Sequence, residues 1–162
     1  MSPPPSPPPQ ISHFLEREGQ QFKKLQRVQN RLARVVLQLI RRDHITPALV
    51  QLHWLPVRHR VTFKIATITF NLLKFHRSSY LYQFVQPYTP SRNLGSLNQN
   101  LLVVNRAHSA FVERSFRHTS AAVAVWNSLS AKCRNCLGLT VETFRKHLKA
   151  HLFETAFMTT AS

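Results

Sequence analysis

The stretch LHWLPVRHRVTFKIATITFNLLKF, residues 52–75, decides the fold of this chain. Pro56 suits the start of a helix, because the N–H that it lacks has no partner at the first helical position and its φ angle is already helical. Apolar residues then recur with the period of one helix face: they are Val57, Val61, Ile65, Ile68 and Leu72, interrupted by Arg58, Arg60 and Lys64. The pattern predicts a core helix with a basic outer side, ending near His76.

A second amphipathic helix is expected from Ser12, which can cap its start, to about Arg42. Gly19 lowers the helix propensity and could divide this segment in two. The expected inner stripe is Phe22, Leu25, Val28, Leu32, Val35 or Val36, and Leu39, and the basic residues largely off that stripe are Lys23, Lys24, Arg27, Arg31 and Arg34. A basic amphipathic helix is a solvated face, a binder of nucleic-acid backbone or a membrane-surface helix.

Shorter elements are expected on both sides of the central stretch. Thr46 followed by Pro47 predicts a short helix that ends near Trp54, and a Ser-Ser cap predicts another over residues 80–85. The run LLVV at 101–104 predicts a short strand, with residues 111–116 as a partner.

Two helices are expected near the C-terminus. Ser120 caps a helix over residues 121–129 that carries Trp126 inward, and Thr140 caps a last helix to about Phe153. In this last helix the inner residues are Val141, Phe144, Leu148 and Leu152, and the outer ones are Arg145, Lys146 and Lys149.

Together these elements predict a mainly α fold, a small helical domain with at most a short two-stranded β ribbon. The domain is expected over residues 12–155, with a disordered tail at 156–162. Six of the first ten residues are Pro, so residues 1–11 are expected to be a disordered tail of polyproline II character. A P-x-x-P segment within residues 1–10 is a candidate ligand for an SH3-type domain.

The charge is strongly unbalanced, with 22 Lys and Arg against 6 Asp and Glu, a net charge of +16. Such a surplus makes nucleic acid the expected partner and an anionic membrane surface the second, unless an acidic half lies elsewhere in a longer chain. Without a long apolar run or a signal peptide, and with only two cysteines, the chain is expected to be intracellular, nuclear or cytoplasmic, and not secreted.

The scarcity of acids also predicts that the chain is not an enzyme. Polymerases and nucleases need clustered carboxylates to hold divalent cations, and Asp43 is the one Asp. Three scattered glycines cannot form a phosphate-binding loop. No cofactor is expected, and the residues expected to bind nucleic acid are Lys23, Lys24, Arg27, Arg31, Arg34, Arg58, Arg60 and Lys64.

One spacing resembles a zinc site: Cys133-x2-Cys136 followed by His147-x3-His151. Two thiolates and two imidazoles can complete a tetrahedral zinc site. The spacer between the pairs is shorter than in zinc fingers, and no β hairpin precedes the helix. The alternative, two ordinary reduced cysteines and two surface histidines, is therefore preferred.

Several longer motifs follow one another in the order of a known pattern. They are LQRVQNRLARVV (25–36), HITPALVQLHWLPVRHRVTFKIATITFNLL (44–73), YLYQFVQPYTPSRNL (80–94), LLVV (101–104), AVWNSLS (124–130) and TFRKHLKAHLF (143–153). Together they resemble the C-terminal region of reverse transcriptases from non-LTR (LINE-type) retrotransposons of animals, over about residues 22–153.

The resemblance implies a post-palm, thumb-like helical element beside a template–primer duplex, in a parent that is an RNA-directed DNA polymerase. The Ala-Asp-Asp box of the palm is missing from this chain, so the resemblance assigns no catalytic residue. It does not require a cysteine at position 133 either, which weakens the zinc hypothesis. The Pro-rich start after Met1 suggests a truncated or captured reading frame.

The leading hypothesis is therefore a non-catalytic, transposable element-derived protein that contacts the backbone of RNA or of an RNA–DNA duplex. Two alternatives stay open. The chain is a retrotransposon-derived remnant without a nucleic-acid function, or it is an adaptor that acts through residues 1–10.

Overall fold

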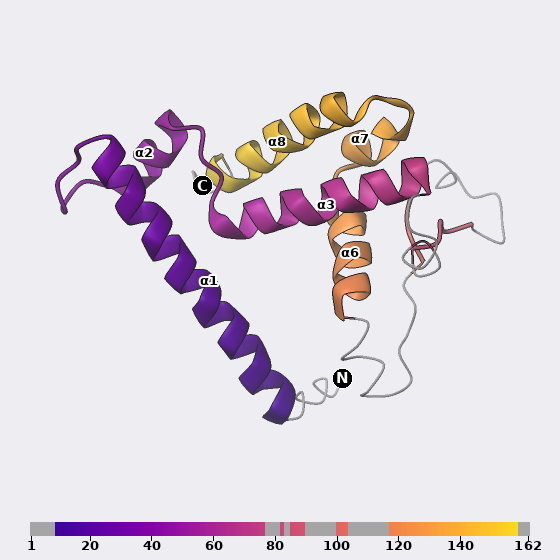
Figure 1. Cartoon of the computed structure of the whole chain (residues 1–162), viewed down its shortest axis with the longest axis horizontal. Coiled ribbons are helices and arrows are strands. Elements are labelled where there is room, and N and C mark those ends of the chain that lie inside the picture. The colour runs from indigo at the N-terminus through magenta and orange to yellow at the C-terminus, as the bar shows by residue number, and fades with distance from the viewer. Residues whose placement is uncertain (1–8, 77–81, 83–84, 90–99, 104–116, 159–162) are drawn as a thin grey trace, which may run out of the picture.

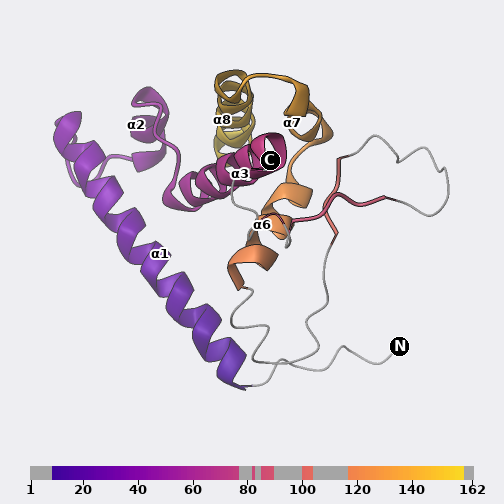
Figure 2. The same ribbon diagram turned by 45° about the vertical axis from the view of Figure 1, so that its right-hand side comes forward.

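A computed structural model of the chain describes residues 9–76, 82, 85–89, 100–103 and 117–158. These residues confirm a mainly helical fold, and no strand is found among them. The elements are α1 (Pro9–Val36), α2 (Ile45–Gln51), α3 (Val57–Phe75), α6 (Arg117–Ser128), α7 (Ala131–Arg134), the 3₁₀ helix η1 (Asn135–Gly138) and α8 (Val141–Phe157). Figures 1 and 2 show α8 lying along α3, with α1 running obliquely away from this pair.

The core lies where α3 packs against α6 and α8. Phe70 of α3 stacks on Phe144 of α8, with ring centroids 4.1 Å apart and an interplanar angle of 11°. Trp126 of α6 is fully buried beside Phe144, as the sequence predicted. Stacked aromatic rings add packing energy to their large buried area, so these three side chains anchor the helices to one another.

The inner face predicted for α3 was correct at Leu72, which is buried in the core, but wrong at Val61 and Ile68. Val61 and Ile68 expose 38% and 50% of their surfaces, whereas Ala66 and Phe70 are fully buried. Apolar residues lie on two sides of the helix, and because both stripes have the helical period, periodicity cannot show which of them is buried. The stripe that contains Phe70 is buried because it faces the aromatic side chains of α6 and α8.

Helix α1 also differs from its prediction at both ends. It begins at Pro9 rather than Ser12, it is continuous through Gly19, and it ends at Val36 rather than near Arg42. At the end, Leu39 N–H donates to Arg34 O (2.9 Å) and Gln38 N–H to Val35 O (3.3 Å), while Gln38 takes a φ of 53°. This is a Schellman motif, which turns the chain out of the helix.

The other helices follow their predictions with shifted ends. Helix α2 has His44 rather than Thr46 as its N-cap and ends at Gln51, and Pro56 is the N-cap of α3 rather than its first residue. Helix α6 begins at Arg117 instead of residue 121, and its last residue is Ser128.

In α8 the predicted cap is confirmed, because Thr143 N–H donates to the Thr140 hydroxyl at 3.2 Å. Its inner residues Phe144, Leu148 and Leu152 are buried as predicted, and the helix continues to Phe157.

Among the described residues, the strand predicted at 101–104 is replaced by a single β-bridge, and its partner is a different segment from the one predicted. Leu102 forms an isolated antiparallel bridge with Pro87, where Tyr88 N–H donates to Leu101 O (2.8 Å) and Val103 N–H to Gln86 O (2.9 Å). The backbone of Leu102 also bonds to the side chain of Asn127. Asn127 Oδ1 accepts from Leu102 N–H (2.9 Å), and Asn127 Nδ2 donates to Leu102 O (3.0 Å). The predicted partner, residues 111–116, lies outside the described residues.

Three predictions fall mostly on residues that the structure does not describe. These are the helix at 80–85, the tail at 1–11 and the tail at 156–162. Of the described tail residues, 9–11 belong to α1 and 156–157 to α8, and Met158 is the C-cap of α8. None of the described helices combines the length and the apolar character needed to cross a membrane.

Candidate nucleic-acid interface

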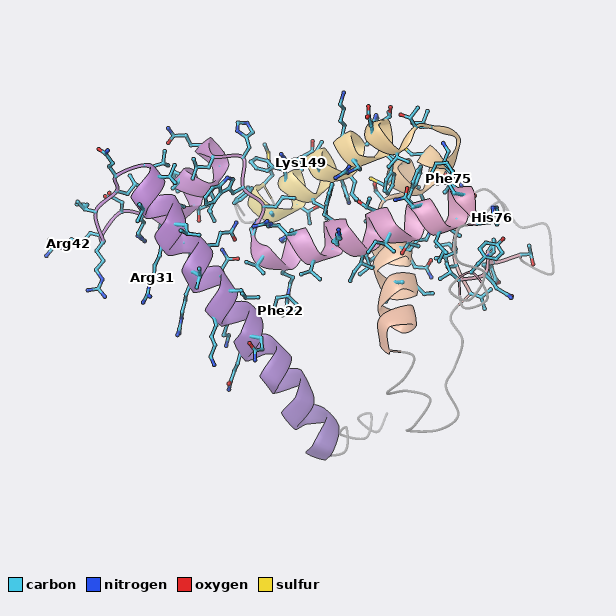
Figure 3. All side chains as sticks on the ribbon, viewed as in Figure 1. Phe22, Arg31, Arg42, Phe75, His76 and Lys149 are labelled. Atoms are coloured by element: carbon cyan, nitrogen blue, oxygen red, sulfur yellow. The ribbon has the colours of Figure 1, made fainter. Side chains whose placement is uncertain are left out.

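The basic residues of α1 share one side of the helix. At about 100° per residue, Lys23, Lys24, Arg27, Arg31 and Arg34 fall within an arc of roughly 100°. The buried residues Gln29 and Ala33 lie on the other side of the helix. Figure 3 shows Arg31 extending away from α3, so this face, here called the basic face, is turned outward.

The basic face has the length and charge density of a nucleic-acid strand. From residue 23 to residue 34 the helix rises by about 16 Å, and one strand of duplex DNA carries about five phosphates over that length. No acid occurs between Gly19 and Arg42 to neutralise the five cations. The face can therefore place one cation near each of several successive phosphates.

Arg34 differs from the other four cations because it also holds the fold together. It is half-buried, and its Nη2 donates to the carbonyl of Asp43 at 3.0 Å, beyond the turn that ends α1. Its Nη1 is buried and has no hydrogen-bond partner among the described residues. Lys23, Lys24, Arg27 and Arg31 are exposed and form the accessible part of the face.

The three predicted residues on α3 do not join the basic face. Arg60 and Lys64 lie one turn apart and line a groove between α1 and α3. Arg58 lies about 120° or more around the helix from both of them. The eight predicted residues therefore form one outer face on α1, a pair in the groove and a separate arginine, and not a single surface.

The groove between α1 and α3 has a volume of about 1000 Å³. Its walls come from exposed apolar residues of the two helices and from the corner that joins α2 to α3. Its apolar lining includes Leu25, Val28, Leu32, Trp54, Val57 and Val61. The prediction that this stripe of α1 is an inner one was wrong: Leu25, Val28 and Leu32 line the open groove and expose about half of their surfaces, and Val35 and Val36 expose 74% and 56%. The described helices do not pack against this side of α1 closely enough to bury it.

Two glutamines of α1, which the sequence patterns missed, hold it against the corner before α3. Gln29 is buried and its Nε2 donates to Leu55 O at 2.8 Å, while Gln26 Oε1 accepts from Val57 N–H at 2.8 Å. Gln26 Nε2 in turn donates to Gln29 Oε1 at 3.1 Å. Val57 is the first residue of α3, so Gln26 supplies a partner for one of the N–H groups that every helix start leaves unpaired. The sequence signal that could have identified them is the position of these two amide side chains beside the apolar stripe of α1.

The four residues of the zinc hypothesis are not brought together. Cys133 and Cys136 are both buried in the core, and Cys136 Sγ donates to Lys132 O at 3.0 Å. Burial, with a smaller contribution from Cys133, raises the pKa of the Cys136 thiol. His147 is exposed on α8. Within the described ranges, no group of three His, Cys, Asp or Glu side chains could hold a metal ion.

The SH3-ligand hypothesis falls on residues 1–10, of which residues 1–8 lie outside the described residues. Pro9 and Gln10 begin α1 and are therefore helical, whereas SH3-type grooves bind polyproline II segments. Comparison with known proteins finds no match to this chain among family models, curated proteins or solved structures. The resemblance to LINE-type reverse transcriptases rests on the sequence motifs and stays a prediction.

Proposed function

We propose that this chain is a non-catalytic protein that binds the phosphate backbone of RNA or of an RNA–DNA duplex with the basic face of α1. The observation that carries the proposal is the gathering of Lys23, Lys24, Arg27 and Arg31 on one exposed face of a helix whose sequence has no acid after Gly19. Contacts of this kind neutralise phosphates and release counterions, which supplies affinity without reading sequence.

An origin in the thumb-like region of a LINE-type reverse transcriptase fits this function. A thumb-like element beside a template–primer duplex needs cations at the spacing of a phosphate backbone, and it needs no catalytic carboxylate of its own. The proposal therefore concerns a binding protein and assigns no reaction to it.

The test is a salt titration of the full chain with a 20-base-pair RNA–DNA duplex, followed by fluorescence anisotropy. Four phosphate contacts, one each from Lys23, Lys24, Arg27 and Arg31, give a slope of log K against log [salt] of about −3.6, at about 0.9 per contact. Replacing Arg27 and Arg31 by Gln removes two contacts and flattens the slope by about 1.8.

The matched control replaces Lys132 and Lys146 by Gln. Both are exposed on α7 and α8, and each pair of substitutions lowers the net charge from +16 by two. The control is expected to keep the wild-type slope. Equal slopes for the two variants would refute the basic face as the binding surface. No binding at low salt would favour a remnant without nucleic-acid function, and capture of an SH3 domain that is lost on deletion of residues 1–8 would favour the adaptor.

A further inference from the structure

The groove between α1 and α3 exposes apolar side chains that the described part of the fold does not cover. Leu25, Val28 and Leu32 of α1 each leave about half of their surface exposed, and Val61 of α3 leaves 38% exposed. Contiguous apolar surface of this kind on a folded domain commonly marks a binding site. It lies on a different side of α1 from the basic face.

The charged groups around this groove have a single sign. Arg60 and Lys64 of α3 and Lys149 of α8 line it, and among the described residues no Asp or Glu lines it. All three are exposed. An occupant that fills the groove must therefore present an apolar strip to the walls and negative charge beside it, because a neutral or basic occupant would leave these cations without partners.

The shape of the groove favours a helix as the occupant. The walls are two helices that meet at an angle beside the α2–α3 corner, as Figures 1 and 2 show, and the volume is at the upper end of the range for small-molecule sites. An amphipathic helix lays its apolar face into such a groove with anchors at positions i, i+3, i+4 and i+7. The bonds from Gln26 and Gln29 to the corner keep the walls in place, which lowers the ordering cost of binding.

Charge argues against a second copy of this chain. A two-fold dimer through the groove would bring the cations of one copy against the same cations of the other, in molecules that each carry +16. A flat membrane surface would match a concave groove poorly, and the backbone of nucleic acid has no apolar strip for Leu25, Val28 and Val61.

We propose that the groove between α1 and α3 binds an acidic amphipathic helix of a partner protein. The apolar residues of that helix pack on Leu25, Val28, Leu32, Trp54, Val57 and Val61, and its carboxylates pair with Arg60, Lys64 and Lys149. The proposal does not depend on nucleic-acid binding, because the basic face contributes no residue to the groove.

The test uses a labelled 18-residue peptide with Leu at positions i, i+3, i+4 and i+7 of each repeat and Glu on its flanks. The comparison peptide carries Lys in place of every Glu. With the full-length chain, fluorescence anisotropy is expected to show at least tenfold tighter binding of the Glu peptide. Val61→Asp, and separately the pair Arg60→Gln and Lys64→Gln, are each expected to weaken that binding by tenfold or more.

The matched control is the pair Arg27→Gln and Arg31→Gln, which lowers the net charge equally but lies on the basic face. It is expected to change peptide binding by less than twofold. Circular dichroism checks that Val61→Asp folds. If it does not fold, the comparison of the Arg60→Gln and Lys64→Gln variant with the Arg27→Gln and Arg31→Gln variant still tests the proposal. Equal affinity for both peptides, or equal loss in both charge variants, would overturn the proposal.

Competition distinguishes the other occupants. The RNA–DNA duplex and phosphatidylserine vesicles are each tested as competitors of the Glu peptide. If either one displaces the peptide, and still does so from the Arg27→Gln and Arg31→Gln variant, that ligand binds in the groove and the proposal is overturned. Sedimentation showing a dimer that Val61→Asp dissociates would overturn it in favour of self-association. A monomer whose peptide complex resists both competitors is the expected result.

Discussion

At the scale of single residues, the junction between α1 and α3 depends on polar side chains. The chain must turn at Leu55 and Pro56 to enter α3, and a buried backbone group at such a turn needs a hydrogen-bond partner. Gln29 supplies a donor to Leu55 O and Gln26 an acceptor to Val57 N–H. Apolar contacts alone would leave these backbone groups unpaired.

Replacing Gln29 by Ala is expected to lower the free energy of unfolding by about 1–3 kcal/mol, because the buried Leu55 carbonyl loses its partner. Urea denaturation followed by circular dichroism measures the change. Gln21→Ala, at an exposed position of the same helix, is the control and is expected to have little effect. Equal midpoints for the two variants would show that the amide contributes nothing.

His59 of α3 is expected to make stability depend on pH. Its pKa is lowered by burial and, to a smaller extent, by the positive charge of Arg58. Its Nδ1 is buried, with no hydrogen-bond partner in the described ranges. The unfolded state therefore binds a proton at His59 more tightly than the folded state does. The contribution of neutral His59 to the free energy of unfolding is fully present above the ordinary pKa of 6.5 and is lost as the pH falls below it.

Urea midpoints measured from pH 8 to pH 5 check this prediction. His59→Gln is expected to flatten the decrease below pH 6.5, and His147→Gln, at an exposed position of α8, is expected to leave it unchanged. A decrease of the same size in both variants would assign the pH dependence to other groups.

At the scale of elements, backbone hydrogen bonds set where the first two helices end. Both α1 and α2 close with a Schellman motif, at Gln38 and at His53, and neither of these residues is glycine. The φ angles of 53° and 52° lie in the left-handed region, which is strained for a residue with a Cβ atom. The hydrogen bonds of this motif end α1 at Val36, although the residues that follow have good helix propensity.

Gln38→Gly is expected to raise the free energy of unfolding by about 1 kcal/mol, because glycine adopts a positive φ without steric cost. Thermal unfolding followed by circular dichroism measures the change. Gln21→Gly, inside α1, is expected to have the opposite effect and to cost about 0.5–1 kcal/mol. Destabilisation by Gln38→Gly would mean that its side chain, not its backbone, matters at this turn.

At the scale of the whole molecule, the positive charge is divided between two surfaces with different chemistry. The basic face of α1 is polar and turned outward, whereas Arg60, Lys64 and Lys149 border apolar walls. A net charge of +16 repels itself in a compact fold, so a polyanion on one surface and an acidic helix on the other would each relieve that repulsion. The two proposals can therefore fail or succeed independently.

The sequence alone determined the features that depend on neighbours along the chain. The helical class, the cap at Thr140, the inner residues of α8, the burial of Trp126 and the shared side of the α1 cations follow from residue type and a 3.6-residue period. Local hydrogen bonds and side-chain spacing are enough to specify them.

Only the tertiary structure decided which surfaces meet. Phe70 rather than Ile68 faces the core because Phe144 lies opposite it, and Leu102 pairs with Pro87 and Asn127, which are distant in sequence. The same holds for the bond from Gln29 to Leu55 and for the groove against α1 that Arg60 and Lys64 line. An apolar stripe shows that a helix has a side to bury, but its partner depends on contacts between residues far apart in the chain.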